Sequence, residues 1–434
     1  MNRELLKLAI PNVLTNLTVP LLSLVDLGLM GRMPNSNYIV AIGLAVVVFN
    51  VIYWAFGFLR MGTTGLVSQA YGRDNTAACY EYLRKGLVIA VLAGIFLILS
   101  QSWIIKIAAF IFEQDPSVLG LIDDYFRIRI YAAPATIGVY VLTGWFLGMQ
   151  DSKSAFWLAL IINVSNILIS LLFVQLYNLE IAGVAIGTLC AQYVGLGLGF
   201  LILKKKYQKD FLEILNKKET DSTWFGFLSI NSDLFVRTML LILVLSFFKT
   251  KAANIDPLIG AANILLLEFI TISAYGIDGF AFAAESICGK YFGKGQSGLF
   301  KNAVMTSFKW GIGVAFLFSV VFYYLGEEVL YLLTDKSEII QVAMEYLPWL
   351  IIAPLINSFA FIWDGIYIGA TASKAMRNLM IISSLIFFLP TFYFARPLFE
   401  NHGLWLALSV FMLSRGILQT IYYNKTIASR LPTG

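Results

Sequence analysis

The sequence predicts an all-α polytopic membrane protein whose twelve transmembrane helices form two pseudo-symmetric six-helix lobes. Of its 434 residues, 59% are hydrophobic and only 13% are charged, whereas soluble domains carry about 25% charged residues. Apolar stretches long enough to cross the hydrocarbon core of a bilayer, which takes about 20 residues, recur along the whole chain. In addition, the two halves of the chain match each other at a nearly constant offset of 221 residues.

Twelve apolar segments account for this pattern. The first contains Pro11 and Pro20, is longer than the apolar part of a secretory signal and has no small-residue cleavage site after it, so we expect it to stay in the protein. The segments are residues 5–30, 38–69, 84–106, 120–149, 154–177, 181–203, 224–248, 258–287, 302–324, 338–369, 376–394 and 402–424.

Reactive side chains are few. The three cysteines, Cys79, Cys190 and Cys288, show no spacing typical of a metal site or a disulfide framework, so we interpret them as free thiols. The one histidine, His402, is predicted at the start of a helix on the outer side. Metal clusters and histidine-based catalysis therefore have almost no residues to use. We expect no enzyme activity, no cofactor and no metal site.

The basic residues predict the orientation, because Lys and Arg accumulate in cytoplasmic loops. With both termini in the cytoplasm, 19 of the 31 Lys and Arg residues lie on the cytoplasmic side and six on the outer side. We therefore predict a multi-pass protein of the inner (plasma) membrane. This orientation and attraction to anionic lipid explain the net charge of +5, so the charge requires no nucleic-acid partner.

An internal duplication divides the chain. A constant offset across several helices is typical of duplicated transporters, and an even number of helices in each half makes the repeats parallel. We predict an N-terminal lobe over 1–203, a basic cytoplasmic linker over 204–222 and a C-terminal lobe over 223–434. The matched pairs are Gly72 with Gly293, Ala132 with Ala353, Gly144 with Gly365, Gly148 with Gly369, Ser152 with Ser373, Lys153 with Lys374 and, one residue out of register, Gly183 with Gly403.

The first helix carries a candidate ion site. A charged group at the bilayer centre costs about 2.5–3.5 kcal/mol, so each one suggests a function. Asn12, Asn16, Ser23 and Asp26 share one face of this helix, which must turn toward protein or water. In that setting Asp26 can exchange a proton as access to it alternates; an ordinary hydrogen bond between helices is the competing interpretation.

The fifth segment offers partners for this face. Asn163 and Asn166 can give amide donors to Asp26 or carbonyl oxygens to a cation. They can equally serve as polar contacts between helices.

The second half carries more charged groups. Asp233 and Arg237 are four residues apart, and Asp278 and Glu285 are seven apart, so each pair shares a helix face. We expect Arg237 to neutralise Asp233 or Asp278. The seven-residue spacing recurs between Asn357 and Asp364, and for the whole group we favour structural charge pairing over contact with a substrate.

Aromatic residues make up 15% of the chain. Some can line a cleft for organic cations, although interface belts and core packing explain most of them. The candidates are Trp54, Tyr131, Tyr140, Trp145, Tyr275, Trp363 and Tyr367.

Three stretches carry a family resemblance: AIPNVLTNLTVPLLSLVDLGLMGR at 9–32, FGFLRMGTTGLVSQAYGR at 56–73 and SAYGIDGFAFAAESICGKYFGK at 273–294. They resemble the MATE (multidrug and toxic compound extrusion) family, in its DinF-like branch. The resemblance implies a V-shaped pair of six-helix lobes that exports cationic or amphipathic substrates in exchange for H⁺ or Na⁺. It also implies that Arg237 and Asp278 belong to a charge network typical of this branch.

The resemblance further implies roles for single residues. It places the coupling aspartate of the first helix on Asp26, a hinge proline on Pro11 and an asparagine of the fifth helix on Asn166. Many relatives carry an aspartate four residues after that asparagine, where this sequence has Ser170. Because a hard cation prefers several oxygen ligands with compensating charge, we expect H⁺ exchange at Asp26 rather than Na⁺ binding.

We therefore predict a monomeric secondary antiporter that works by alternating access. It exports small organic, cationic or amphipathic compounds in exchange for H⁺, with Na⁺ as the alternative ion, and its other partner is the membrane lipid around it. In this hypothesis protonation of Asp26 bends the first helix near Pro11. The alternative function is a flippase for lipid-linked precursors or polysaccharide, from the same broad superfamily.

Overall fold

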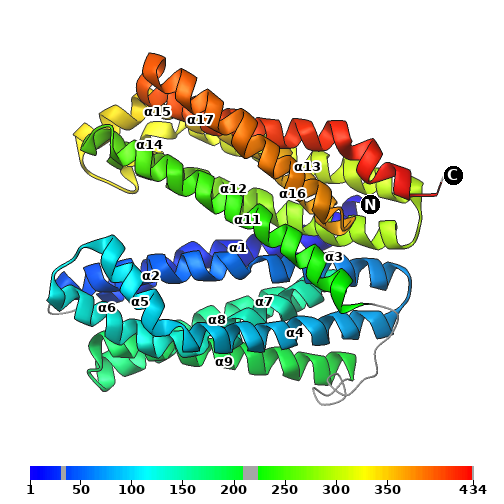
Figure 1. Cartoon of the computed structure of the whole chain (residues 1–434), viewed down its shortest axis with the longest axis horizontal. Helices are drawn as coiled ribbons and strands as arrows, with labels where there is room; N and C mark the ends of the chain where they lie inside the picture. The colour runs from blue at the N-terminus through cyan, green and yellow to red at the C-terminus, as the bar shows by residue number, and fades with distance from the viewer. Residues whose placement is uncertain (31–35, 209–222, 433–434) are drawn as a thin grey trace. The chain divides into compact units, whose positions relative to one another are not determined.

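The computed structural model describes residues 1–30, 36–208 and 223–432, and it describes their side chains except those of 19–36. All regular elements in these ranges are helices, which confirms the predicted fold class (Figure 1). The helices form two compact units. One comprises residues 14–67 and 75–228, and the other comprises 1–13, 68–74 and 229–434.

The helices agree with twelve membrane crossings. Ten helical segments among the described residues are long and apolar enough to span a bilayer. The last of them, Ser373–Arg430, has 58 residues, and its backbone leaves the helical conformation at Glu400 (φ 48°, ψ −117°), so it covers two predicted spans. Helix α1 (Asn2–Met30) contains the first predicted span and is not among these ten segments.

The first unit is built from helices of the N-terminal half. Its core includes Trp145, which is fully buried and donates a hydrogen bond from Nε1 to the carbonyl of Cys79 at 2.9 Å. Tyr207 packs edge-on against the same indole. The helices are α2 (Ser36–Phe56), α3 (Phe58–Gly72), α4 (Thr76–Leu99), α5 (Gln101–Phe112), α6 (Pro116–Arg129), α7 (Ala133–Gly148), α8 (Ser152–Leu171) and α9 (Glu180–Tyr207).

The second unit is built from the C-terminal half together with the start of α1 and the end of α3. Helices α12 and α15 pack along each other, and Phe248 and Trp405 lie in the apolar core around them. The helices are α11 (Trp224–Ala253), α12 (Pro257–Gly293), α13 (Ser297–Tyr324), α14 (Gly326–Tyr331), α15 (Ser337–Gly369), α16 (Ser373–Ile382) and α17 (Leu389–Thr426).

The structure repeats at the offset seen in the sequence. After α7, the backbone N–H of Asp151 donates to the carbonyl of Phe146 at 2.8 Å; after α15, that of Ala372 donates to Tyr367 at 2.9 Å. Both members of the second pair lie 221 residues beyond those of the first. The two turns therefore have the same hydrogen bonding, which confirms the repeat at this point of each half.

Close helix contacts also repeat. A Cβ added to Gly144 would lie 2.4 Å from the carbonyl oxygen of Arg60, and one added to Gly365 would lie 2.3 Å from that of Ala281. Residues 60 and 281 are again 221 apart. Only glycine permits such close approach of two helix backbones.

One further contact joins the two copies of a single motif. A Cβ on Gly72 would lie 2.1 Å from the carbonyl oxygen of Lys290, and a Cβ on Gly293 would lie 2.2 Å from that of Gln69. Gln69 corresponds to Lys290 and Gly72 to Gly293 at the repeat offset. The contact is therefore reciprocal: the glycine of each copy packs against the backbone carbonyl of the other copy.

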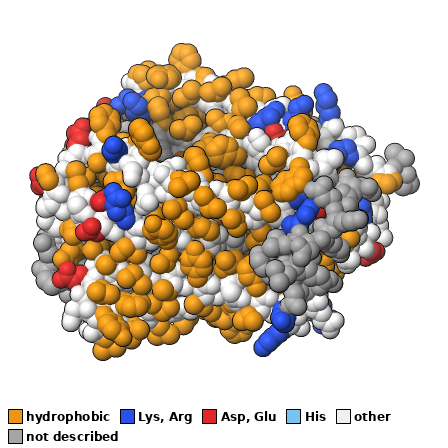
Figure 2. Space-filling model, turned by 60° about the horizontal axis from the view of Figure 1, so that its bottom comes forward, with side chains coloured by type: hydrophobic (Ala, Val, Ile, Leu, Met, Phe, Trp, Pro, Cys, Tyr) orange, Lys and Arg blue, Asp and Glu red, His pale blue; other side chains and the backbone are white. Residues whose placement is uncertain are grey.

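The surface is that of a membrane protein. Large apolar side chains are highly exposed, among them Phe110 (82%), Phe225 (81%) and Phe394 (77%). Figure 2 shows hydrophobic side chains spread over most of one face, with charged side chains gathered toward its left and right ends. Such exposure is stable against lipid chains and unfavourable in water.

The structure shows the surroundings of the three cysteines and the histidine. Cys79, Cys190 and Cys288 are free, as predicted, and two of them are buried. His402 on α17 accepts a hydrogen bond at Nδ1 from the indole of Trp349 at 3.0 Å. That bond ties α15 to α17.

Candidate functional site

A neutral polar group lies between α8 and α9. Asn166 on α8 is buried and donates from Nδ2 to the hydroxyl of Thr188 on α9 at 3.3 Å. Ser170, one turn further along α8 and fully buried, donates to Oδ1 of Asn166 at 3.1 Å. Gly187 makes room, because a Cβ there would lie 2.1 Å from the Ser170 hydroxyl. The group consists of one amide and two hydroxyls, without a carboxylate among its members.

The other predicted asparagine of α8 faces α1. Asn163 donates from Nδ2 to the hydroxyl of Thr18 at 2.7 Å. The structure therefore brings α8 to the first helix, as predicted, but through Thr18, which the sequence pattern did not single out. Asp26 lies on α1 among the residues whose side chains are not described.

The other predicted residues of α1 fall on both sides of a boundary between units. Asn12 is 3% exposed and belongs to the unit that contains residues 1–13, whereas Asn16 belongs to the unit that begins at residue 14. Pro11 lies within the helix, where its ring removes one backbone hydrogen bond. Its role as a hinge stays a prediction.

In the second half, three helices converge on one buried carboxylate. Asp364 on α15 forms ion pairs with Arg237 on α11 and with Arg415 on α17. It also accepts a hydrogen bond from Nε2 of Gln419 at 2.8 Å. Asp364 and Arg237 are under 10% exposed, and Arg415 is 2% exposed. We call Asp364, Arg237, Arg415 and Gln419 the Asp364 cluster.

We expected Arg237 to neutralise Asp233 or Asp278, and its pairing with Asp233 is wrong. Although the two residues share a face of α11, Arg237 reaches across to Asp364. Asp233 instead pairs with Arg377 of α16 at 2.6 Å and accepts a hydrogen bond from Ser373 at 2.9 Å. Sequence spacing shows which residues are neighbours on one helix, but the partners here come from other helices.

The two acidic residues of α12 lie near these groups. Asp278 interacts electrostatically with Arg415. Glu285 is 1% exposed, at a place where a Cβ on Gly369 of α15 would lie 2.5 Å from its backbone carbonyl. Glu285 therefore belongs to the tightly packed α12–α15 region of the unit, whereas Asp278 is half-buried.

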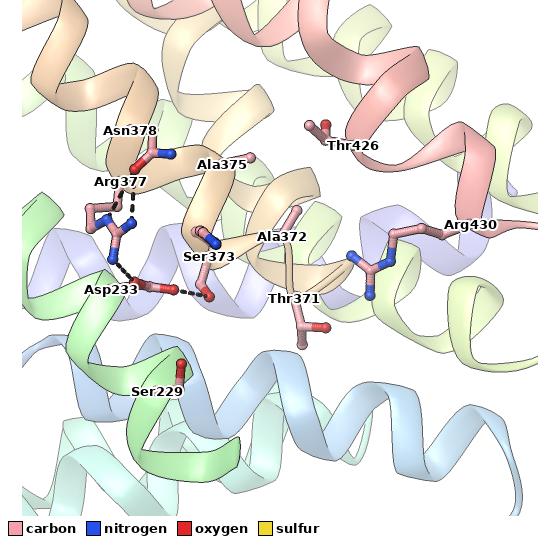
Figure 3. Close-up of a pocket in the computed structure, with 11 residues that line it drawn as sticks. Ser229, Asp233, Thr371, Ala372, Ser373, Ala375, Arg377, Asn378, Thr426 and Arg430 are labelled. Atoms are coloured by element: carbon pink, nitrogen blue, oxygen red, sulfur yellow. Dashed lines mark hydrogen bonds and ion pairs between the residues drawn. The ribbon is translucent and has the colours of Figure 1, made fainter. Parts of the chain in front are cut away.

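A cavity of about 690 Å³ opens beside Asp233 (Figure 3). It is lined by residues at the start of α16 and by the end of the chain. Lys374, Arg377 and Arg430 bring positive charge to its wall, and Asp233 brings one negative charge.

A buried carboxylate holds the corresponding turn of the first half. Asp151 accepts hydrogen bonds from Lys206 at 2.6 Å, from the Ser154 hydroxyl at 2.6 Å and from the Tyr207 hydroxyl at 2.8 Å. Burial acts to raise the pKa of Asp151, but these three hydrogen bonds outweigh it and leave the pKa below its ordinary value.

Three of the seven candidate aromatic residues are buried in the protein core. Trp145 and Tyr367 are fully buried, and Trp363 is 5% exposed and packs edge-on against Phe308. Only Trp54 (55%) and Tyr131 (49%) of the seven are strongly exposed. The structure therefore favours core packing for the three buried residues.

Several buried polar and charged residues were not predicted. Arg415 and Gln419 complete the Asp364 cluster, and Glu81 pairs with the fully buried Lys85 on α4 at 2.7 Å. Each pair is four residues apart, so each shares a helix face. An arginine inside an apolar segment requires a partner, and that signal was available for Arg415.

Comparison with known proteins agrees with this architecture. The sequence matches the MatE family over two stretches, residues 11–172 and 236–394. It is 33% identical to DNA damage-inducible protein F of Escherichia coli (strain K12), over 96% of this chain and 90% of that protein. It is 26% identical to multidrug and toxin extrusion protein 1 of Homo sapiens, over 86% of this chain and 65% of that protein.

The fold is also found among solved structures. A multidrug resistance MATE family transporter in an outward-facing conformation superposes with a TM-score of 0.90, over 100% of this chain and 97% of that one, at 17% identity. The MatE homologues are transporters and not enzymes. With its two family matches and its membrane-spanning helices, the chain belongs to the MATE family and is a multi-pass transporter of the multidrug and toxin extrusion type.

Proposed function

We propose that this transporter is an H⁺-coupled antiporter that exports organic cations or amphipathic compounds by alternating access. Asp26 is the residue that takes up the proton, and the Asn166 group is the wall of the site on α8 and α9. Na⁺ is the alternative coupling ion. The observation that carries the choice of H⁺ is the neutral Asn166 group.

The chemistry of the Asn166 group disfavours Na⁺. A hard cation needs several oxygen ligands, usually with carboxylate charge among them. Here Oδ1 of Asn166 already accepts from Ser170, and the hydroxyl of Thr188 accepts from Asn166. A cation would have to break these bonds and would receive no negative charge from the three side chains. A proton that binds to a carboxylate on α1 has no such requirement.

The Asp364 cluster does not supply an alternative cation site. Its one carboxylate faces two guanidinium groups, so the three side chains carry a net positive charge. An incoming Na⁺ would have to replace an arginine that is already paired in a buried site. We assign the cluster to holding α11, α15 and α17 together.

The proposal extends to organisation and location. Two lobes, 1–203 and 223–434, joined by a cytoplasmic linker over 204–222, rearrange around a substrate site in a monomer. The protein lies in the inner membrane of the cell, and both of its termini face the cytoplasm. Pro11 is the position at which α1 bends when Asp26 is protonated.

The test is counterflow of an organic dye cation in proteoliposomes. A pH gradient and a Na⁺ gradient are imposed separately on the wild type, on Asp26→Asn and on Asp115→Asn. Asp115 is exposed at the start of α6, so its variant controls for the same chemical change. We expect dye efflux driven by the pH gradient in the wild type and Asp115→Asn, and none in Asp26→Asn.

Three other results would each contradict one part of the proposed function. Efflux that follows only the Na⁺ gradient overturns the choice of ion. Efflux that is driven by the pH gradient and persists in Asp26→Asn removes Asp26 from the mechanism. Dye that moves under neither gradient rejects the antiporter and turns attention to flippase assays with lipid-linked substrates.

A further inference from the structure

The two halves differ at one corresponding position, the residue that precedes the helix after each inner turn. In the first half this residue is Asp151, and one of its carboxylate oxygens accepts a hydrogen bond from the backbone N–H of Ser154 at 3.3 Å. Its other oxygen is bound by Lys206, Tyr207 and the Ser154 hydroxyl. The start of α8 thus has a built-in anion with three further donors.

In the second half the same position holds Ala372. The backbone of its turn has the same hydrogen bonds as the turn at Asp151. Alanine has no acceptor side chain, and α16 begins without a side-chain cap. The first N–H groups of a helix have no acceptor within the helix and carry partial positive charge. Position 372 therefore supplies no anion of its own in the second half, and the carboxylate nearest this helix start is that of Asp233, which accepts a hydrogen bond from Ser373 at 2.9 Å.

A cavity occupies the space next to this helix start. The 690 Å³ cavity is lined by Ala372, Ser373, Lys374 and Ala375, the first residues of α16 and its cap. In the first half, the Asp151 carboxylate binds Lys206 and Tyr207 beside the start of α8. The cavity therefore lies where the repeat leads one to expect an anion.

The charge of the cavity wall favours an anion. Lys374 and Arg377 line it from α16 and Arg430 lines it from the segment after α17, and Asp233 is the one carboxylate among its lining residues. Asp233 is already bound by Arg377 and Ser373. Figure 3 shows Arg377 and Arg430 on opposite sides of the turn that contains Ala372 and Ser373.

Arg430 is held in place by its own contacts. Its Nη1 donates to the carbonyl of Ala370 at 3.2 Å, and its guanidinium lies over the ring of Phe292, 5.0 Å from the centroid. These contacts set the guanidinium beside the turn. Among the residues that the structure describes it forms no other hydrogen bond, so its remaining N–H groups can bind a ligand. A preorganised arginine loses little conformational entropy when it binds an oxyanion.

We propose that this cavity is an anion site that binds a phosphate group between the start of α16, Lys374 and Arg430. Phosphate offers several acceptor oxygens, which suits backbone N–H groups together with lysine and arginine. The phosphate is either that of an anionic phospholipid headgroup or free phosphate from solution. In the proposed orientation the site faces the cytoplasm, where basic pockets between helices meet anionic lipid. The inference does not depend on which ion drives transport.

The test measures ligand-induced stabilisation of the full-length protein in phosphatidylcholine nanodiscs. The midpoint of thermal unfolding is followed as inorganic phosphate is added, with sodium chloride of equal ionic strength as the reference. In a second arm phosphatidylglycerol replaces part of the phosphatidylcholine. We expect a rise in the midpoint in at least one arm; the arm that responds identifies the source of the phosphate.

Three variants test the position of the site. Arg430→Gln and Lys374→Gln each remove one charge-assisted contact, so each should weaken binding about tenfold or more. Ala372→Asp copies the first half and places a tethered carboxylate at the helix start. It should abolish the response to phosphate and raise the unfolding midpoint without ligand. Lys425→Gln removes an exposed basic residue near the same end of α17 that does not line the cavity, so it should respond like the wild type.

Two results overturn the proposal. One is an unfolding midpoint that changes in neither arm beyond the sodium chloride reference. The other is an equal response in the wild type, Arg430→Gln and Lys374→Gln. If Ala372→Asp does not fold, the two glutamine variants still decide the question. Transport is not measured in this experiment, so its outcome is separate from that of the dye assay.

Discussion

Arg237 and Asp364 lie 127 residues apart in the sequence, on α11 and α15, and form a buried ion pair. Arg415 adds a second guanidinium from α17. The carboxylate therefore links three helices of one unit. Because both arginines depend on a single carboxylate, its loss affects the two of them at once.

Asp364→Asn should strongly destabilise the protein. The substitution leaves two buried guanidinium groups without a compensating charge, and removing one partner of a buried ion pair costs about 3–5 kcal/mol. The measurement is thermal unfolding of the purified protein in detergent, together with the yield of monodisperse protein. Asp335→Asn, at an exposed position, is the control. An Asp364→Asn variant that unfolds at the wild-type temperature would show that the cluster contributes little to stability.

Alanine at either Gly72 or Gly293 should loosen the contact between α3 and α12. The added Cβ would lie about 2 Å from a backbone carbonyl oxygen, so the backbones must move apart. We expect a loss of about 1–3 kcal/mol for each variant, typical of overpacking. Gly313→Ala is the matched control, because a Cβ there meets nothing within 4 Å. Equal unfolding temperatures for all three variants contradict the proposed contact.

Asp151 should make stability depend on pH in the acid range. Its pKa is below the ordinary value in the folded protein, so the unfolded state binds the proton more readily. The stabilisation is therefore complete above the ordinary aspartate pKa of about 3.9 and declines as the pH falls toward the lowered folded pKa. Asp151→Asn keeps an acceptor at the start of α8 but removes the charge.

The measurement for Asp151 compares unfolding midpoints of the wild type and Asp151→Asn from neutral pH to pH about 3. The difference should be constant near neutrality and should shrink in the acid range. Asp115→Asn, at an exposed position, should follow the wild type throughout. A difference that grows as the pH falls has the wrong sign and contradicts the assignment.

Ser170→Asp should introduce sensitivity to Na⁺. It places a carboxylate four residues after Asn166, inside the neutral group on α8 and α9. Ser170→Asn has nearly the same size without the charge, so it controls for crowding against Gly187. We expect Na⁺-dependent dye efflux or Na⁺-dependent stabilisation in Ser170→Asp alone. If both variants behave alike, the added volume and not the charge is responsible.

Much of the fold was predictable because a bilayer requires long apolar helices, which are visible in the sequence. The duplication was predictable because matching residues recur at an offset of 221 within the chain. The family followed from three continuous stretches. The pairing of Arg237 was not predictable, since helix periodicity gives neighbours on one helix and says nothing about Asp364 on another. Asn163 was placed correctly against α1, but its partner Thr18 lies outside the polar stripe that pointed to the contact.

The anion site illustrates a second limit of sequence patterns. The sequence aligns Ser152 with Ser373 and Lys153 with Lys374, and it thereby suggests that the two turns are equivalent. The functional difference lies one residue earlier, where Asp151 corresponds to Ala372. Only the structure shows that the first turn is closed by its own carboxylate and that a cavity lies beside the second.

The reciprocal contact of Gly72 with Lys290 and of Gly293 with Gln69 has the form of an isologous interface, in which one surface patch meets a second copy of itself. Two identical half-length subunits related by a twofold axis would make this same contact. A six-helix ancestor that assembled as a homodimer would therefore have had the contact before its gene was duplicated and fused. The two copies are no longer identical, since one inner turn carries Asp151 and the corresponding turn carries Ala372.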